Sequence, residues 1–131
     1  MNILIADDHA NVRRGLKELL VDSFPNAHFS EASDGDEVLS KLILSQPDIL
    51  LLDINMPRRN GFEVLKDVKL TYPLVPVIMV SVQPENQYAT RCLQAGATAY
   101  VSKSSASEDL VPAIKKILEN VAKLARTPNV N

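Results

Sequence analysis

The chain has few of the residues that stabilise small secreted domains or anchor membrane proteins. Its 131 residues include one cysteine, Cys92, and no tryptophan. A lone cysteine cannot form an internal disulfide, which agrees with a reducing cytoplasm, and we expect Cys92 to be an apolar filler on a helix. No apolar run approaches the roughly 20 residues of a membrane-spanning helix, and no basic, apolar leader precedes the first strand-like run. We therefore expect a cytoplasmic protein without a membrane anchor.

Positive charge and aromatic residues are also scarce. The formal net charge is −2, so the domain lacks the basic surface that would neutralise the phosphates of nucleic acids or of an anionic membrane. Aromatic residues make up 5% of the chain and hydrophobic residues 46%, which indicates one compact domain with an aliphatic core. Partners are expected to be recognised by shape.

Short apolar runs alternate with segments of helical periodicity. Five runs are typical of strands, of which the second is expected to be less buried: 2–6, 27–32, 49–52, 75–81 and 97–102. An amphipathic segment follows each, and the first three of these end at turn-forming pairs, Pro25-Asn26, Gln46-Pro47 and Tyr72-Pro73. We expect the fourth helix at about 84–95, capped by Gly96 in a left-handed conformation. This order predicts an α/β fold, a three-layer doubly wound (βα)5 parallel sheet with the flavodoxin-like strand order 2-1-3-4-5.

The last helix carries an apolar stripe over 110–121. Its start is ambiguous, because Ser105 and Glu108 have the spacing of a capping box. A helix that began there would place Pro112 beyond the first turn, where proline removes a backbone hydrogen bond. We therefore expect the helix to begin near Asp109 or to bend locally.

Acidic residues follow two of the expected strands. Asp7 and Asp8 come directly after the first apolar run, and Asp53 comes directly after the third. In a sheet of this strand order, the carboxyl ends of strands 1 and 3 flank the ligand crevice, so the three acids should converge there. Three carboxylates repel one another unless a hard divalent cation neutralises them, which indicates Mg²⁺ (or Mn²⁺).

Ser81 and Lys103 extend this group of side chains, because Ser81 closes the fourth expected strand and Lys103 follows the fifth. One divalent cation and one ammonium would bring the charge of about −3 on the three carboxylates close to neutrality. A phosphoryl group on Asp53 would be stabilised by the cation, the Lys103 ammonium and the Ser81 hydroxyl. The crevice is therefore predicted to hold an acyl phosphate.

Taken together, these residues resemble the receiver domain of two-component response regulators. The similarity covers residues 2 to about 122, with motifs in the family's order and spacing: Asp7-Asp8, Asp53-Ile-Asn-Met-Pro57 with Gly61, Ser81, Ala95-Gly-Ala97, Tyr100 and Lys103. A similarity to the receivers of LuxR/NarL/FixJ-type transcriptional regulators rests on Asp7-Asp8-His9 and Lys103-Ser104. The resemblance implies a CheY-like receiver domain over 1–122, followed by 123–131 as the end of the last helix and a linker or tail.

The resemblance also implies a role for each residue of the group. Asp53 would accept a phosphoryl group from a sensor histidine kinase or a phosphotransfer protein. Lys103 would pair with Asp53 and then with the phosphoryl group, and Ser81 would hydrogen-bond a phosphoryl oxygen. Mg²⁺ (or Mn²⁺) would be held by the side chains of Asp8 and Asp53, the backbone carbonyl of Asn55 and, through water, Asp7.

A receiver of this kind is a switch with little enzymology of its own. Tyr100 would rotate into the space that Ser81 leaves, changing the surface formed by the helix 84–95, the strand 97–102 and the last helix. Activity would be limited to self-phosphorylation from small donors and self-dephosphorylation. The expected output is transcription regulation through an output domain absent from this chain, and a phosphorylation-dependent homodimer is a further expectation.

Three residues near Asp53 are expected to set the lifetime of the phosphoryl group. Most receivers have a very small residue after the switch hydroxyl, whereas this chain has Val82. We expect its bulk to slow phosphoryl exchange or loss. Asn55 and Gln83 are placed to influence the water that attacks the phosphorus.

Other polar residues nearby have structural interpretations. As the less favoured alternative to its role at the metal site, Asp8 is in a position to cap the first helix. His9 beside the acids could line the pocket, but it is interpreted as a surface side chain, and Arg13 is interpreted as a solvated charge.

Competing functions remain open at this level. A hydrolase of the haloacid dehalogenase type also uses an aspartate nucleophile, but it needs a second acid two residues later, where this chain has Asn55. A flavin or nucleotide-binding module needs a phosphate loop rich in glycine or hydroxyl residues after the first strand, where Asp7 and Asp8 stand. A stand-alone single-domain regulator acting by protein–protein interaction, or a phosphorylation-independent pseudo-receiver, would keep the same fold.

Overall fold

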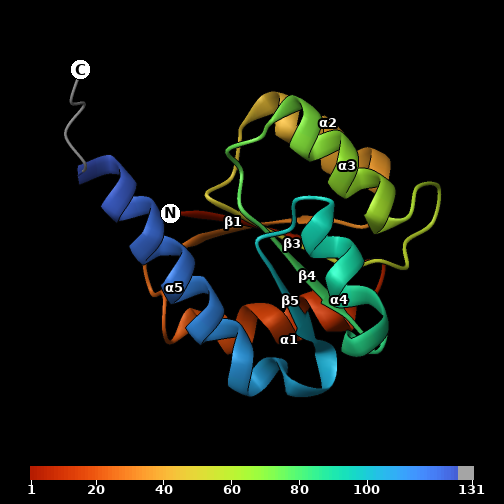
Figure 1. The fold of residues 1–131 in the computed structure, drawn as a ribbon. Coiled ribbons are helices and arrows are strands. Elements are labelled where there is room, and N and C mark those ends of the chain that lie inside the picture. The colour runs from red at the N-terminus through yellow and green to blue at the C-terminus, as the bar shows by residue number, and fades with distance from the viewer. Residues whose placement is uncertain (127–131) are drawn as a thin grey trace.

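The chain folds as a single parallel sheet between two layers of helices, seen in a computed structural model that describes residues 1–126 (Figure 1). A 3₁₀ turn, η1 (Lys103–Ser105), precedes the last helix. In chain order the regular elements are β1 (Asn2–Ala6), α1 (Ala10–Val21), β2 (His28–Ala32), α2 (Gly35–Leu44), β3 (Ile49–Leu52), α3 (Gly61–Thr71), β4 (Val77–Ser81), α4 (Glu85–Gln94), β5 (Ala99–Ser102) and α5 (Ala106–Arg126).

The sheet has the strand order β2-β1-β3-β4-β5, with every neighbouring pair parallel. The predicted three-layer α/β fold is therefore confirmed. β1 lies between β2 and β3, and Ala6 is in register with Leu52, so the carboxyl ends of β1 and β3 are side by side. Residues that directly follow these two strands therefore meet.

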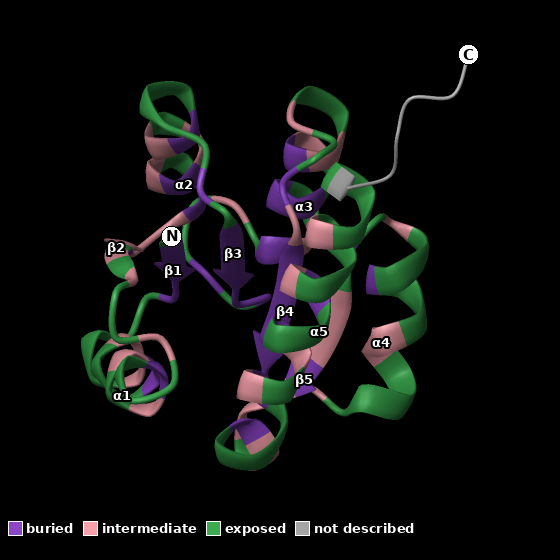
Figure 2. Cartoon of the chain, turned by 90° about the vertical axis from the view of Figure 1, so that its left-hand side faces the viewer, coloured by how far each residue is buried: buried purple, intermediate pink, exposed green. Residues whose placement is uncertain are grey.

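Two hydrophobic cores form because alternate strand residues point to opposite faces of the sheet. Leu4 and Leu52 pack with buried residues of α2, α3 and α4, whereas Ile3 and Leu51 pack with buried residues of α1 and α5. Figure 2 shows the central strands buried and the outward surfaces of the helices exposed. No helix among residues 1–126 is both long and apolar enough to cross a membrane.

The end of α4 follows the predicted glycine cap. Gly96 has φ 107°, in the left-handed region that favours glycine. Its backbone N–H donates to the Leu93 carbonyl at 3.1 Å, and the N–H of Ala97 donates to the Cys92 carbonyl at 3.0 Å. These two bonds form a Schellman motif, which ends α4 and directs the chain into β5.

The predicted start of α5 near Asp109 is wrong, because the helix begins at Ala106 and contains Pro112; the alternative of a local bend stays a prediction. Ala106 and Leu110 are 7% and 0% exposed, so the first turn contributes to the core beneath the sheet. Proline leaves the carbonyl of Glu108 without its helical donor, but both residues are exposed, where water can take that place. Core burial therefore outweighs the local preference against proline.

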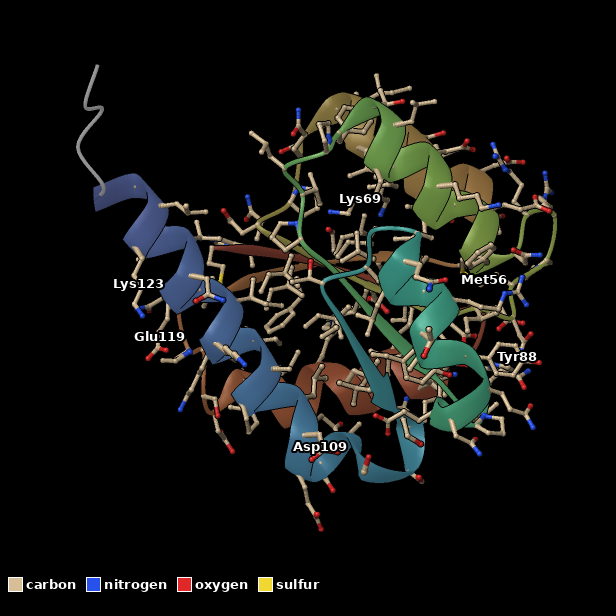
Figure 3. The ribbon with its side chains drawn as sticks, viewed as in Figure 1. Met56, Lys69, Tyr88, Asp109, Glu119 and Lys123 are labelled. Atoms are coloured by element: carbon tan, nitrogen blue, oxygen red, sulfur yellow. The ribbon has the colours of Figure 1, made fainter. Side chains whose placement is uncertain are left out.

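The last helix extends well past its buried first turns. Figure 3 shows α5 running from Asp109, near the carboxyl end of β5, to Glu119 and Lys123 at its far end. Residues 127–131, which include most of the expected linker or tail, lie outside the described residues.

Candidate functional site

The buried polar and charged side chains of residues 1–126 all lie at one edge of the sheet. They are Asp7, Asp53 and Ser81, which are 1%, 3% and 0% exposed, and each stands at the carboxyl end of β1, β3 or β4. The Asp53 N–H donates to the Ala6 carbonyl at 3.0 Å, which continues the β1–β3 pairing past the last residue of β3. Burying a polar group is costly unless it is satisfied or used, so this edge is the strongest candidate for a functional site.

Lys103 joins the two buried carboxylates. Its Nζ lies 2.6 Å from Oδ2 of Asp7 and 3.6 Å from Oδ2 of Asp53. One ammonium therefore faces two carboxylates, and within the described residues Oδ1 of Asp53 accepts no hydrogen bond. The pocket is left with excess negative charge and a free acceptor, which suits a cation.

The environment of Asp53 disfavours its charged form. Burial raises the pKa of this carboxyl from 3.8, the ordinary value of aspartate, to about 6. The charge of Asp7 raises the pKa further, whereas Lys103 and the backbone N–H groups of Asn55 and Ile54 lower it. Lys103 therefore compensates only part of the desolvation of Asp53.

Asp8 and His9 stand at the entrance to this pocket. The N-cap of α1 is His9, which makes no side-chain capping bond, so the interpretation of Asp8 as a helix cap is wrong. The His9 ring Nδ1 lies 3.2 Å from Oδ1 of Asp7 and 3.0 Å from Oδ1 of Asp8. The His9 side chain is 66% exposed, as the surface interpretation expected, and it also contacts both acids, as the alternative of a residue lining the pocket expected.

The loop after β3 is held against the site by a glycine. The Gly61 N–H donates to the Ile54 carbonyl at 2.6 Å, and a Cβ on Gly61 would lie 1.9 Å from the backbone oxygen of Asp53. Only glycine allows this approach. Asn55, on the same loop, is exposed beside Asp53, and Met56 returns to the core at 8% exposure (Figure 3).

The loop after β4 connects Ser81 to Tyr100. The Gln83 N–H donates to Oγ of Ser81 at 3.1 Å, and the Tyr100 hydroxyl donates to the Gln83 carbonyl at 2.8 Å. Burial raises the pKa of Tyr100, which keeps this hydroxyl protonated as a donor. Val82 lies between these contacts and is 67% exposed.

Arg13 is not the solvated charge that the sequence suggested. Its side chain is 16% exposed; Nη1 donates to the Asp7 carbonyl at 2.6 Å and Nε donates to Glu31 at 2.8 Å. The hydrogen bond from Arg13 lowers the pKa of Glu31. Arg13 therefore fixes the backbone at Asp7 from α1, a role for which the sequence offered no clear signal.

Residues 3–115 match the family model of the response regulator receiver domain. The chain belongs to this family. It is 32% identical over 122 residues to the transcriptional regulatory protein DegU of Brevibacillus brevis, covering 93% of this chain and 52% of that protein. It is 33% identical over 117 residues to the response regulator GacA of Pseudomonas viridiflava, covering 89% and 55%. The chain thus spans about half the length of these relatives.

Solved receiver structures have the same architecture. A CheY-like receiver domain protein from Methanospirillum hungatei JF-1 superposes with a TM-score of 0.83 at 30% identity, covering 93% of this chain and 96% of that one. A LuxR-family response regulator from Aurantimonas sp. SI85-9A1 also gives 0.83, at 29% identity and 91% and 85% coverage. The chain is therefore a receiver domain of two-component response regulators, a signalling domain rather than an ordinary enzyme.

Proposed function

We propose that this receiver is a phosphoacceptor switch in which Asp53 takes a phosphoryl group from a sensor histidine kinase or a phosphotransfer protein. The observation that carries the proposal is the setting of Asp53: 3% exposed, 3.6 Å from Lys103, and with Oδ1 free of hydrogen bonds among the described residues. A free carboxylate oxygen beside a fixed ammonium has what a nucleophile needs, an available electron pair and a counter-charge for the product.

The donor set of the pocket fits the divalent cation of the proposal. Asp7, Asp8 and His9 place one ligand atom each within 4.8 Å of one another, and the unpartnered Oδ1 of Asp53 adds an oxygen acceptor. Mg²⁺ (or Mn²⁺) would be held by the side chains of Asp8 and Asp53, the backbone carbonyl of Asn55 and, through water, Asp7. When bound, it would supply positive charge against the phosphoryl oxygens.

Transfer follows from the residues around Asp53. A carboxylate oxygen of Asp53 attacks phosphorus, the P–N bond to the donor histidine breaks, and the electron pair stays on the imidazole nitrogen. Lys103 then faces the new phosphoryl charge, and the Ser81 hydroxyl can donate to a phosphoryl oxygen. Asn55, Val82 and Gln83 border the path of the water that later hydrolyses the acyl phosphate, so they set its lifetime.

The receiver would transmit its signal by a change in the surface of α4, β5 and α5 rather than by a second chemical reaction. The Ser81–Gln83–Tyr100 hydrogen bonds connect the phosphorylated edge to the loop before α4 and to β5, so a shift of Ser81 would change the balance between two arrangements of the surface formed by α4, β5 and α5. Because relatives are about twice as long and one is named a transcriptional regulatory protein, regulation of transcription through an output domain outside this chain is the proposed consequence. Formation of a homodimer is one way to transmit it.

Intact-mass spectrometry tests the proposal directly. The protein is incubated with acetyl phosphate or phosphoramidate and Mg²⁺, beside an Asp53→Asn variant and an EDTA control. The expected result is one phosphoryl adduct that depends on metal and is lost in the variant. Metal binding without any adduct would contradict the proposal and favour a pseudo-receiver whose partner binding is independent of phosphate.

A further inference from the structure

We propose that Arg13 is a positioning residue of the metal site, which holds the turn between β1 and α1 so that Asp7 and Asp8 can bind the divalent cation. The inference rests on the metal site of the proposed function but not on phosphoryl transfer. Arg13 lies outside the set of residues expected to contact the ion or the phosphoryl group, and its positive charge would by itself oppose a cation there. Its side chain is nevertheless only 16% exposed and directed at this turn.

The turn that carries the two acids is fixed at three points of Asp7. The Asp7 N–H donates to the Ala32 carbonyl at 3.0 Å, and Oδ1 of Asp7 accepts the His9 N–H at 2.9 Å. The third point is the Asp7 carbonyl, which accepts Nη1 of Arg13 at 2.6 Å. This carbonyl belongs to the planar peptide unit between Asp7 and Asp8, so the direction of both acids depends on the plane that Arg13 holds.

Arg13 is itself held from the neighbouring strand. Its Nε donates to Oε1 of Glu31 at 2.8 Å, and Glu31 lies on β2, which pairs with β1. Lys17, one turn further along α1, faces Oε2 of the same carboxylate at 3.5 Å, but among residues 1–126 it makes no hydrogen bond or ion pair with Asp7. A guanidinium presents several donors in a fixed planar fork, whereas an ammonium is a single charged centre. The link from β2 through α1 to the Asp7 carbonyl therefore suits arginine and not lysine.

Charge and position make opposite predictions for the loss of Arg13. If charge alone mattered, removing a cation beside the Asp7–Asp8 peptide would strengthen the binding of a second cation. If Arg13 positions the acids, removing it frees the peptide plane, and the ion must then order the turn as it binds. Hydrogen-bonded partners that orient metal ligands are worth about 10- to 100-fold in affinity, and the charge of Arg13 is already balanced by Glu31. The geometry therefore predicts weaker binding.

Urea denaturation at a series of Mg²⁺ concentrations separates this role from a purely structural one. The free energy of unfolding in EDTA measures what Arg13 contributes to the fold, and its increase with Mg²⁺ gives the dissociation constant of the ion. We expect Arg13→Met to raise that constant at least about tenfold. Arg13→Lys keeps the charge but not the fork of donors, so it should also bind Mg²⁺ more weakly than the wild-type protein. Lys17→Met, the matched control, removes a cation that faces the same carboxylate and should leave the constant unchanged or lower it.

The same titrations contain the results that would overturn the inference. An unchanged or lower dissociation constant in Arg13→Met, or equal effects of Arg13→Met and Lys17→Met, would overturn it and leave the metal site of the proposed function intact. If Arg13→Met does not fold in EDTA, Arg13→Lys decides by the same criterion. Wild-type protein that gains no stability from Mg²⁺ would overturn both this inference and the metal dependence of the proposed function.

Discussion

Replacing Asp53 by asparagine should stabilise the metal-free protein. Burial raises the pKa of Asp53 from 3.8 to about 6, so keeping the folded carboxylate charged at pH 8 costs about 3 kcal/mol at 1.36 kcal/mol per pKa unit. Asparagine has nearly the same shape and no charge, so it removes this cost. In a domain of this size, a gain of about 3 kcal/mol corresponds to roughly 10 °C in melting temperature.

The raised pKa also determines how the stability difference between Asp53→Asn and the wild-type protein changes with pH. The folded pKa lies above the unfolded one, so between pH 4 and pH 6 the folded protein retains a proton that the unfolded chain has released. Wild-type stability from this group therefore falls as pH rises through that interval. The advantage of Asp53→Asn should be full at pH 8, about half by pH 5, and absent well below pH 4.

Urea denaturation in EDTA at pH 5 and pH 8 measures both the size and the sign. Asp22→Asn is a suitable control, because Asp22 is exposed at the end of α1 and its neutralisation should add less than about 1 kcal/mol at either pH. A variant no more stable than wild type at pH 8, or one with the same gain at both pH values, would refute the reasoning.

Three further substitutions test the supports of the site. Gly61→Ala places a Cβ 1.9 Å from the Asp53 carbonyl oxygen and should lower the free energy of unfolding, measured in urea, by at least about 2 kcal/mol. The control Gly15→Ala has open space around its Cβ and should raise the free energy of unfolding by about 0.5–1 kcal/mol. Equal effects of the two substitutions would contradict the close approach at Gly61. Tyr100→Phe removes a 2.8 Å hydrogen bond and should cost about 1 kcal/mol in the same assay, so an unchanged midpoint would contradict it. Val82→Ala should speed phosphoryl uptake from small donors and phosphoryl loss, followed by intact mass, and unchanged rates would show that its bulk does not limit access.

The sheet and the acidic pocket could be predicted because both depend on local patterns that fix global positions. Buried parallel strands are short apolar runs, and the residue after such a run must lie at the carboxyl edge of the sheet. Asp7 and Asp53 meet for that reason, and the register of Ala6 with Leu52 places them on neighbouring strands. Gly96 was predictable for a similar reason, because helix ends in a left-handed conformation favour glycine.

The features that could not be predicted depend on competition between local conformational preferences and tertiary packing. The start of α5 was placed too late because the cost of an internal Pro112 is visible in sequence, whereas the burial of Ala106 and Leu110 is not. The contacts of His9 and Arg13 depend on side-chain rotamers at the first turns of α1. Residue type gives no information about those rotamers, so a surface position was the favoured interpretation of both residues.

The buried polar groups also explain why the site and the stability of the fold are coupled. Asp7, Asp53 and Ser81 are the buried polar side chains of residues 1–126, and the two carboxylates share one ammonium, that of Lys103. A domain selected only for stability would pair each carboxylate fully or replace it with an apolar residue. Here one oxygen of Asp53 remains unpaired and its pKa is raised, so the metal-free pocket is less stable than an apolar core would be. Any ligand that adds positive charge relieves that cost in the folded state alone, and the same imbalance that destabilises the pocket therefore favours binding of cations there.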